Sequence, residues 1–330
     1  MGIHGTGRHT NMSNTEINTS PSSSNFVPRV DVPADVVARW ENDTVIAQHN
    51  LHESPLFDDE GLIELIDRTA RDHLYALSMG TDLTRPDENL LALHEHLDGR
   101  QLLDAVKAGR LWLNITRIHE HAAAHSSVAD DLYAQLANRI PGFEPTITTL
   151  TLLISSPQAM VYYHVDGPAN LLWHIRGEKT IWIYPPEEQF VSQVDLEDIF
   201  ASVSHEYIDY DPGFDARATE VPLTPGMLAG WRPNSPHRVT NGNSFNVSLS
   251  TEHYTPHQRT KARVYQANRL LRTKLGRSSL ATSTSGPVAA AKQATFAVAR
   301  RTGQLPATSS KQHVPALRVD PDAPNGVVPL

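Results

Sequence analysis

Cysteine is absent from this sequence of 330 residues. Its absence excludes disulfides, thiolate metal sites, cysteine nucleophiles and cysteine-ligated iron–sulfur clusters. Long apolar runs are also missing, and the first 26 residues lack the apolar core of a secretory signal. We therefore expect a cytoplasmic protein with no membrane partner, in which any metal is held by His, Asp or Glu side chains.

Acidic residues are missing from the C-terminal part of the chain. From Arg259 to Arg318 there are twelve Lys and Arg and no Asp or Glu, whereas the residues before Arg259 hold sixteen Lys and Arg against thirty-five Asp and Glu. One interpretation is that the basic segment binds nucleic acid or another acidic partner. The other, which we favour, is that its helices pack back on the acidic body, because the segment has few aromatic residues for stacking on bases. We accordingly expect no nucleic-acid partner.

Composition divides the chain into four segments. Residues 1–30 are rich in Ser, Thr and Asn and are predicted to be disordered. Residues 31–258 are predicted to form one domain, with helices followed by a β-barrel. Residues 259–302 read as a basic helical region, and residues 303–330 as a disordered tail. An apolar stripe from Val264 to Leu275 predicts a helix that offers a homodimer interface.

The spacing of apolar residues changes near residue 146. Before this point it predicts helices at 57–78 and 126–140, and a helix followed by a strand at 99–118. After it, the segments 147–156, 162–186, 227–241 and 244–254 are typical of strands separated by Gly and Pro turns. Such a run favours an antiparallel barrel or sandwich. The segment 195–223 is predicted to be irregular. Its part 195–220 is long for a loop and is a candidate lid, with Tyr207, Tyr210 and Phe214 covering a substrate or pinning the loop.

Two candidate metal ligands stand two residues apart in the second of these strand segments. Residues two apart in a strand point to the same side, so we expect His164 and Asp166 to converge while Val165 faces away. His237 begins a later strand directly after Pro236 and is the best candidate for a third ligand. Two His and one carboxylate form a facial triad, which leaves open coordination positions and suits non-haem Fe(II) with oxygen.

Further polar residues in the same strands call for a ligand. A Lys inside a barrel loses hydration unless an anion pairs with it, and Lys179 shares strand parity with Ile181. Asn170 and Asn246 also occur in strand-like stretches, where Asn is depleted. A keto acid with two carboxylates, chelating iron at one end and meeting Lys179 at the other, would satisfy these groups. His174 is left open between a substrate contact and a packed core residue.

These motifs resemble those of a known family. The segment "HVDGPANLLWHIRGEKTIWIYPP" (164–186) is similar to the core motif of the JmjC/cupin-like 2-oxoglutarate- and Fe(II)-dependent hydroxylases, and "GMLAGWRPNSPHRVTNGNSFNVSLS" (226–250) resembles bacterial cupin-like members. The resemblance implies an α+β fold, a double-stranded β-helix with flanking helices. It implies iron ligands at His164, Asp166 and His237, Lys179 as partner of the distal carboxylate of 2-oxoglutarate, and amides at Asn170 and Asn246 near its keto-acid end.

The reaction implied by the resemblance is hydroxylation of an unactivated C–H bond, with Fe(II), 2-oxoglutarate and O2. The substrate would be a protein or peptide side chain or a small metabolite. Two positions depart from the family pattern: Met227 replaces a usual Asp, and Val161 replaces a hydroxyl-bearing residue. Two alternatives remain open. One is a cupin-fold metal enzyme that does not use 2-oxoglutarate, and the other is a non-catalytic metal-binding interaction module.

Overall fold

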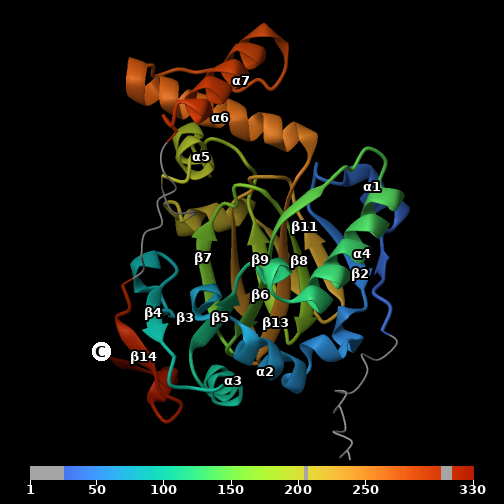
Figure 1. Cartoon of the computed structure of the whole chain (residues 1–330), viewed down its shortest axis with the longest axis vertical. Coiled ribbons are helices and arrows are strands. Elements are labelled where there is room, and N and C mark those ends of the chain that lie inside the picture. Colours follow the sequence, from blue (N-terminus) through green and yellow to red (C-terminus); the bar gives the residue numbers. More distant parts are fainter. Residues whose placement is uncertain (1–25, 204–206, 306–313) are drawn as a thin grey trace, which may run out of the picture.

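The computed structural model describes residues 26–203, 207–305 and 314–330 (Figure 1). In this part of the chain the strands form two sheets, one of eleven strands and one of four. Helices lie on the outside of the sheets and in a separate C-terminal layer. None of the described helices combines the length and the apolar character that a membrane span requires.

Eight consecutive strands, β6 to β13, form the centre of the molecule as two antiparallel layers of four. In chain order they alternate between the layers, except that β9 and β10 are neighbours in the small sheet. This is the strand order of a jelly roll, or double-stranded β-helix, so the predicted fold class is confirmed. One layer runs β6 (Thr146–Ser155), β13 (Asn246–Tyr254), β8 (Ala169–Arg176), β11 (Met227–Gly230), and the other runs β10 (Thr219–Leu223), β9 (Lys179–Ile183), β12 (His237–Asn241), β7 (Met160–His164).

The larger sheet continues beyond the jelly roll at both edges. Next to β11 it adds β2 (Val45–His49) and β1 (Val30–Asp31). Next to β6 it adds β5 (Leu111–Ile115), β3 (Leu74–Ser78), β4 (Leu90–Leu93), β14 (Leu317–Val319) and β15 (Val327–Pro329). The second extension matters for the site, because β5 lies beside β6 and its side chains reach the same interior.

Helices cover the outer face of the large sheet. Those of the N-terminal half are α1 (Ala34–Arg39), α2 (Asp59–Arg68), α3 (Gly99–Ala108) and α4 (Ala123–Arg139). The apolar faces of α2, α3 and α4 share one core with the outward side chains Leu171 and Trp173 of β8 (Figure 1). The alternate residues of β8, Asn170, Leu172 and His174, face the interior between the two sheets. β8 is therefore buried on both faces, and its polar residues Asn170 and His174 lie on the interior face, whereas Arg176 at its end contacts Asp59 of α2.

A C-terminal layer is formed by α6 (Pro256–Leu275) and α7 (Gly286–Arg301), with α5 (Gln193–Phe200) between it and the jelly roll (Figure 1). The helix predicted from Val264 to Leu275 lies within α6, which ends at Leu275 and is followed by Gly276, whose φ of +62° suits glycine. The homodimer interface is not supported as predicted. Val264 and Ala267, the first half of the stripe, are fully buried within the chain, so they are already used in packing.

Five expectations about the bounds of elements need correction. The segment predicted to be irregular, 195–223, holds most of α5 and all of β10. The predicted helix 57–78 ends at Arg68, and its last residues form β3, because Leu74–Ser78 pair with β5 rather than continuing the helical face. The helix expected at 126–140 already begins at Ala123. The predicted tail 303–330 is wrong for its last residues: β14 adds to β4 in parallel and fully buries Val319 in the core. Residues 1–25 lie outside the described chain, but Val30 already belongs to β1.

Candidate metal and co-substrate site

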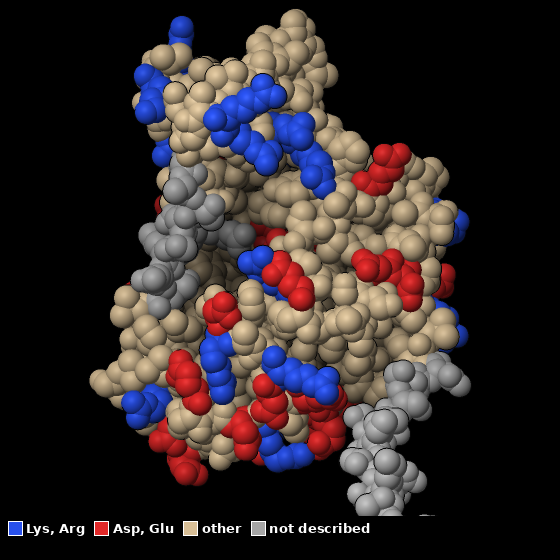
Figure 2. Space-filling view, in the orientation of Figure 1, with Lys and Arg blue, Asp and Glu red and all other residues tan. Residues whose placement is uncertain are grey.

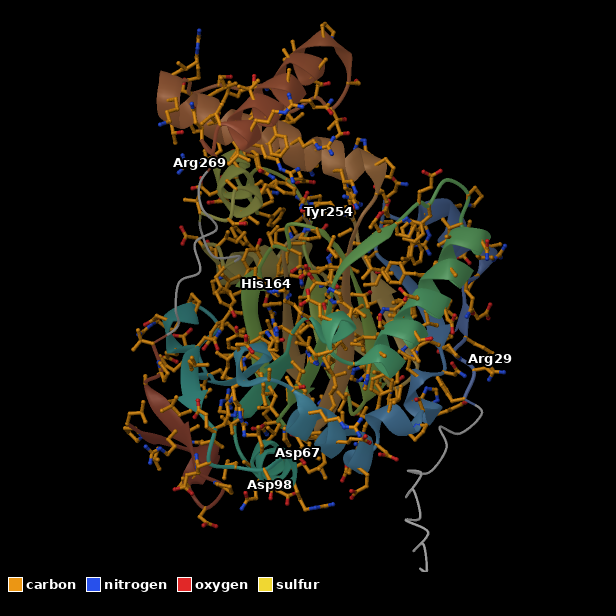
Figure 3. The ribbon with its side chains drawn as sticks, in the orientation of Figure 1. Arg29, Asp67, Asp98, His164, Tyr254 and Arg269 are labelled. Atoms are coloured by element: carbon orange, nitrogen blue, oxygen red, sulfur yellow. The ribbon has the colours of Figure 1, made fainter. Side chains whose placement is uncertain are left out.

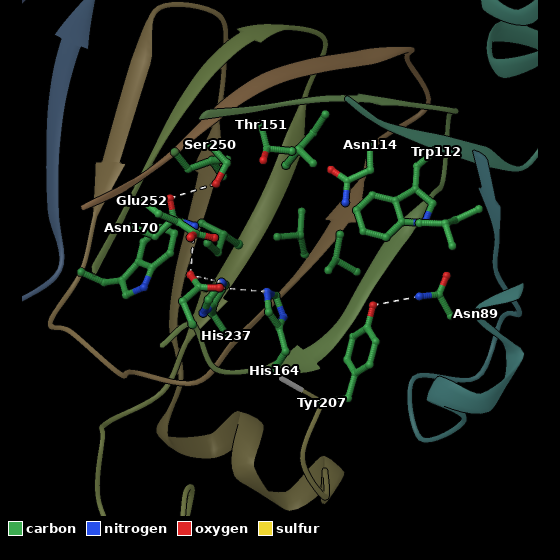
Figure 4. A pocket seen from close by; sticks show the side chains of 18 residues that line it. Asn89, Trp112, Asn114, Thr151, His164, Asn170, Tyr207, His237, Ser250 and Glu252 are labelled. Atoms are coloured by element: carbon green, nitrogen blue, oxygen red, sulfur yellow. Dashed lines mark hydrogen bonds and ion pairs between the residues drawn. The ribbon is translucent and has the colours of Figure 1, made fainter. Parts of the chain in front are cut away.

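The three predicted metal ligands lie together at one end of the jelly-roll interior (Figure 4). One donor atom from each of His164, Asp166 and His237 lies within 4.8 Å of the other two. Nε2 of His164 is 3.8 Å from Asp166 Oδ1, and Nε2 of His237 is 3.5 Å from Asp166 Oδ2. Both imidazoles therefore aim the same nitrogen at one carboxylate, which is the arrangement expected of a shared cation.

The other nitrogen of each ring fixes its orientation. Nδ1 of His164 lies 2.8 Å from the carbonyl oxygen of Tyr162, and Nδ1 of His237 lies 3.1 Å from that of Ser235. A carbonyl only accepts, so Nδ1 carries a proton in both rings, and Nε2 is the lone-pair donor in the neutral form of each ring. Burial, with His164 as a second cause, lowers the pKa of His237 to about 4, so this imidazole is neutral at pH 7. Neutral imidazoles and a carboxylate are the protonation states that metal binding needs.

The local backbone differs from the expectation that His164 and Asp166 share a strand. His164 is the last residue of β7, and Asp166 lies in the turn that follows. His237 is the first residue of β12 and is paired with His164 across the two strands. Asn234 Nδ2 donates to the carbonyl oxygens of Asp166 and Gly167, at 2.9 and 3.1 Å, and holds the turn. The ligands therefore converge through strand pairing and a fixed turn, not through the two-residue repeat.

Asn170 lies next to the ligands, where it orients the carboxylate. Its Nδ2 donates to Asp166 Oδ2 at 2.9 Å, and its Oδ1 accepts from the Ser250 hydroxyl at 3.0 Å (Figure 4). Side chains that hold a metal-ligating carboxylate are typical of the outer shell of metal sites.

The ligands open on a cavity of about 300 Å³ between the two sheets. Its middle is apolar, with Leu172, Ile181 and Val239. Asn114, Thr151 and Glu252 line the wall contributed by β5, β6 and β13, and they face the ligands in Figure 4. Among the described residues, no Lys or Arg lines this cavity. The remaining lining residues are Leu77, Asn89, Trp112, Leu153, Val161, His164, Asp166, Asn170, Tyr207, Trp231, His237 and Ser250.

Lys179 lies beyond the apolar middle of the interior, at the start of β9. It faces the same side as Ile181, which is two residues along the strand and lines the cavity, so Lys179 is roughly 6–7 Å deeper. Its side chain is buried, and it makes no hydrogen bond or ion pair with any residue that the structure describes. Burial alone lowers the pKa of its ammonium to about 7. A buried amine without an anion is costly, so this position calls for an anionic ligand.

Asn246 does not join the metal ligands. It is the first residue of β13 and lies beside the turn between β8 and β9, and its Nδ2 donates to the carbonyl oxygen of Ser244 at 2.7 Å. A Cβ at Gly177 in this turn would lie 2.8 Å from Asn246 Oδ1 and 2.2 Å from the carbonyl oxygen of Phe245, so only glycine fits there. Asn246 Oδ1 is buried without a partner in the described chain. Asn246 therefore lies at the same end of the interior as Lys179, whereas the prediction placed it near the keto-acid end of 2-oxoglutarate.

Glu252 occupies the place beside the ligands that Asn246 was expected to fill. On β13 it is paired with Asn170 of β8. Burial, with the nearby Asp166 carboxylate as second cause, raises the pKa of Glu252 to about 7. The sequence holds the signal that finds it: the inward parity of Asn246, Ser248 and Ser250 continues to residue 252.

His174 is fully buried and holds the turn that carries Lys179. Its Nε2 donates to the Gly177 carbonyl oxygen at 2.9 Å, so its Nδ1 is unprotonated and accepts from the Ser248 hydroxyl at 3.0 Å. Burial, followed by the charge of Lys179, lowers the pKa of His174 to about 3. The ring is neutral with both nitrogens occupied. Of the two roles left open, the packed residue is the one observed.

Tyr207 is the part of the candidate lid that reaches the cavity. It forms a β-bridge with His164, and its hydroxyl accepts a hydrogen bond from Asn89 Nδ2 at 2.9 Å (Figure 4). Tyr210 and Phe214 instead pack against Tyr163 on the other side of β7. The segment is therefore pinned by two aromatic residues while a third lines the cavity.

Fold and site together define a jelly-roll protein with a His–Asp–His group at one end of its interior and a buried lysine at the other. No protein-family model and no curated protein matches the sequence. Among solved structures, the chain is similar to YcfD of E. coli, with 14% identity, 87% of this chain and 70% of that chain covered, and a TM-score of 0.47. A structure described as the E. coli ribosomal oxygenase YcfD has 12% identity, coverage of 89% and 76%, and a TM-score of 0.44. Another, in complex with cobalt and 2-oxoglutarate, has 14% identity, coverage of 87% and 73%, and a TM-score of 0.41.

Proposed function

We propose that this protein is a 2-oxoglutarate- and Fe(II)-dependent dioxygenase that hydroxylates an unactivated C–H bond. The observation that carries the proposal is the combination of two sites in one interior. A three-donor metal group lies at one end, and an unpaired buried ammonium lies at the other. A ligand with a chelating keto acid at one end and a carboxylate at the other matches both.

The residues fit the metal that the proposal needs. His164, Asp166 and His237 would hold the Fe(II) through two neutral imidazole nitrogens and one carboxylate oxygen, a donor set that leaves coordination positions open. The iron, together with 2-oxoglutarate and O2, supplies the oxidising power for attack on the C–H bond. Asn170 and Ser250 keep the Asp166 carboxylate in place for this role.

Lys179 would bind the distal carboxylate of 2-oxoglutarate. Its position beyond Leu172 and Ile181 keeps water away from the pair, so the charge interaction is strong. Because its pKa is about 7 without an anion, Lys179 is largely neutral at pH 8 and must take up a proton when the dianion binds. His174 would hold the hairpin in place for this contact through the Gly177 carbonyl oxygen.

The primary substrate would enter the side of the cavity formed by Asn114, Thr151 and Glu252. Since no described Lys or Arg lines the cavity and two carboxylates do, a neutral or cationic group fits better than an anionic one. We propose a protein or peptide side chain or a small metabolite, because the volume left beside the co-substrate is small. The cytoplasmic location stays a prediction.

The test is an anaerobic titration of the protein with Fe(II) and then 2-oxoglutarate, watched for the weak visible charge-transfer band of the chelate. We expect the band in the wild type, and a higher 2-oxoglutarate concentration for half-saturation in Lys179→Met. Absence of the band in a folded wild-type protein would contradict the proposal. If iron binds without the band, and no substrate pool leads to succinate release, the cupin-fold metal enzyme without 2-oxoglutarate is favoured.

A further inference from the structure

An arginine-lined groove lies on the outer face of the C-terminal layer. Arg263 of α6 and Arg300 and Arg301 of α7 border it, and Phe296 of α7 lines it together with Gln293 and Ala297. The three arginines are exposed and Phe296 is half-buried. In Figure 2 the Lys and Arg side chains gather on this upper lobe, where no Asp or Glu is seen on the face shown. We call this feature the arginine groove.

The charges of the arginine groove are not explained by packing on the acidic body. Arg269 and Arg272, on another face of α6, do pair with Asp198 and Glu197 of α5, with 2.7 Å between Arg272 Nε and Glu197 Oε2. By contrast, Arg263, Arg300 and Arg301 form no ion pair with any residue in the described ranges. The chain from 259 to 318 holds no carboxylate side chain, so neither helix can supply one.

Contrary to the expectation from the composition of the basic segment, we propose that the arginine groove binds single-stranded nucleic acid. Guanidinium groups match phosphate oxygens with paired donors, and the exposed cations of the groove are all arginines. Lys292 of the same helix is turned inward, where its Nζ donates to the carbonyl oxygen of Ala281. Phe296 places an aromatic ring among these cations, and aromatic stacking on bases is the second element of single-strand binding sites.

The aromatic ring and the amide distinguish this partner from others. An acidic peptide would use the arginines but has no planar base for Phe296. A duplex hides the faces of its bases, so it would meet only the charges. The amide of Gln293 is suited to a base edge exposed in a single strand. The proposal is independent of the metal site, because the groove shares no residue with the jelly-roll interior.

The experiment measures binding of a fluorescein-labelled twelve-nucleotide oligouridylate to the full chain by anisotropy, across a range of salt concentrations. The variant Arg263→Gln/Arg300→Gln/Arg301→Gln is expected to lower the slope of log affinity against log salt by about 2, since each phosphate contact contributes roughly 0.7 for a single strand. The matched control, Arg39→Gln/Arg85→Gln/Arg100→Gln, removes as many exposed arginines from the body and should leave the slope unchanged. An equal effect of both triples would overturn the groove as the site.

A second variant tests stacking apart from charge. Phe296→Leu keeps an apolar residue and should weaken oligouridylate binding about 5- to 100-fold without changing the salt slope. An oligodeoxyuridylate of the same length distinguishes RNA from DNA within the proposed class. If polyglutamate or anionic vesicles bind as tightly and Phe296→Leu has no effect, the partner is an acidic peptide or a membrane surface and the proposal is wrong. Absence of binding at low salt would also refute it. Asp166→Ala should bind the oligonucleotide like the wild type, which separates this result from the proposed oxygenase activity.

Discussion

The jelly-roll interior and the C-terminal layer both carry charged side chains, but the free energies at stake differ greatly. In the interior, Asp166 and Lys179 are buried, and an unmatched charge there costs several kcal/mol. On the C-terminal layer, Arg263 and Arg300 are exposed, and ion pairs at such positions contribute only about 0–1 kcal/mol. A polar residue in a buried strand therefore indicates a ligand even when only the sequence is known. A surface arginine indicates a ligand only when the structure shows which residues surround it.

The largest effect is expected from removing the shared carboxylate of the metal group. Asp166→Ala takes away the one anionic donor, the carboxylate toward which both imidazoles point. Loss of an outer partner of a metal ligand typically costs about 10–100-fold in metal affinity, so loss of the ligand itself should exceed about 100-fold. Anaerobic calorimetry with Fe(II), or with Mn(II) as a stable substitute, measures the change. An affinity within threefold of the wild type would remove Asp166 from the metal site.

Lys179→Met tests what a buried charge costs, in contrast to the exposed arginines. It should raise the stability of the ligand-free protein and lower that of the protein with bound 2-oxoglutarate. Removing one partner of a buried charge pair costs about 2 kcal/mol or more, so half-saturation by 2-oxoglutarate should rise about 30-fold or more while Fe(II) affinity is kept. The ligand-free variant should be more stable than the wild type at pH 7, because methionine has no buried charge to solvate. Thermal unfolding with and without 2-oxoglutarate separates the two effects.

The pKa of Lys179 gives a prediction about pH. In the ligand-free protein its pKa is lowered to about 7, against 10.5 for the ordinary value. The unfolded chain therefore binds more protons between these values, and the stability penalty is fully present below pH 7 and is relieved as the pH rises toward 10.5. Binding of 2-oxoglutarate should take up close to one proton at pH 8 and far fewer at pH 6. Calorimetry in buffers of different ionisation enthalpy measures this number, and equal uptake at both pH values would contradict the assignment.

Asn170→Ala tests whether this amide acts on the metal through Asp166. The change removes the hydrogen bond to Asp166 Oδ2 and leaves the carboxylate free to rotate. We expect roughly a tenfold loss of Fe(II) affinity, at the lower end of the range for outer-shell partners. Ser250→Ala is the milder comparison, since it removes only the bond that orients Asn170. If Asn170→Ala weakens 2-oxoglutarate binding while sparing iron, the residue contacts the co-substrate instead.

The smallest effect belongs to the C-terminal layer, where two arginines of one helix provide a matched pair. Arg272→Ala leaves the fully buried carboxylate of Glu197 without its cation and should destabilise the protein by about 1–3 kcal/mol, because among the described residues Glu197 keeps only the hydrogen bond from Gln193. Arg263→Ala removes an exposed arginine without an ion pair to the described residues, and should change stability by less than about 0.5 kcal/mol. Urea unfolding of the two variants measures both values. Equal losses of unfolding free energy in the two variants would show that the ion pair of Arg272 with Glu197 does not contribute to stability.

Much of the fold and of the site could be predicted from the sequence because buried groups obey strict rules. The strands of the jelly roll follow from apolar patterning and turn residues. The inward direction of the Lys179 side chain follows from its position two residues before Ile181 in the same strand. The convergence of His164 with His237 could not be derived from spacing, since it depends on the pairing of β7 with β12. Asn246 was assigned to the wrong end of the interior. It is six residues from Glu252 on β13, and at about 3.3 Å per residue this places the two side chains at opposite ends of the interior.

The edges of the molecule were the least predictable part. The strand Leu317–Val319 is three residues long, too short for any alternation to be recognised, and it is held by pairing with β4 on one side and β15 on the other. Likewise the end of α2 at Arg68 depends on the pairing of the following residues with β5. Both features arise from partners distant in the sequence, which local propensity does not encode.

The direct pairing of His164 with His237 has a consequence for folding. These ligands stand at opposite ends of a chain segment of about seventy residues, so a bound metal would close a long loop in the way a cross-link does. A metal that binds the native state and not the unfolded chain would stabilise the native state by mass action. Because the protein has no cysteine and so no disulfide, iron would be the cross-link between two strands of the small sheet. Amide hydrogens at the junction of β7 and β12 should then exchange more slowly when metal is present.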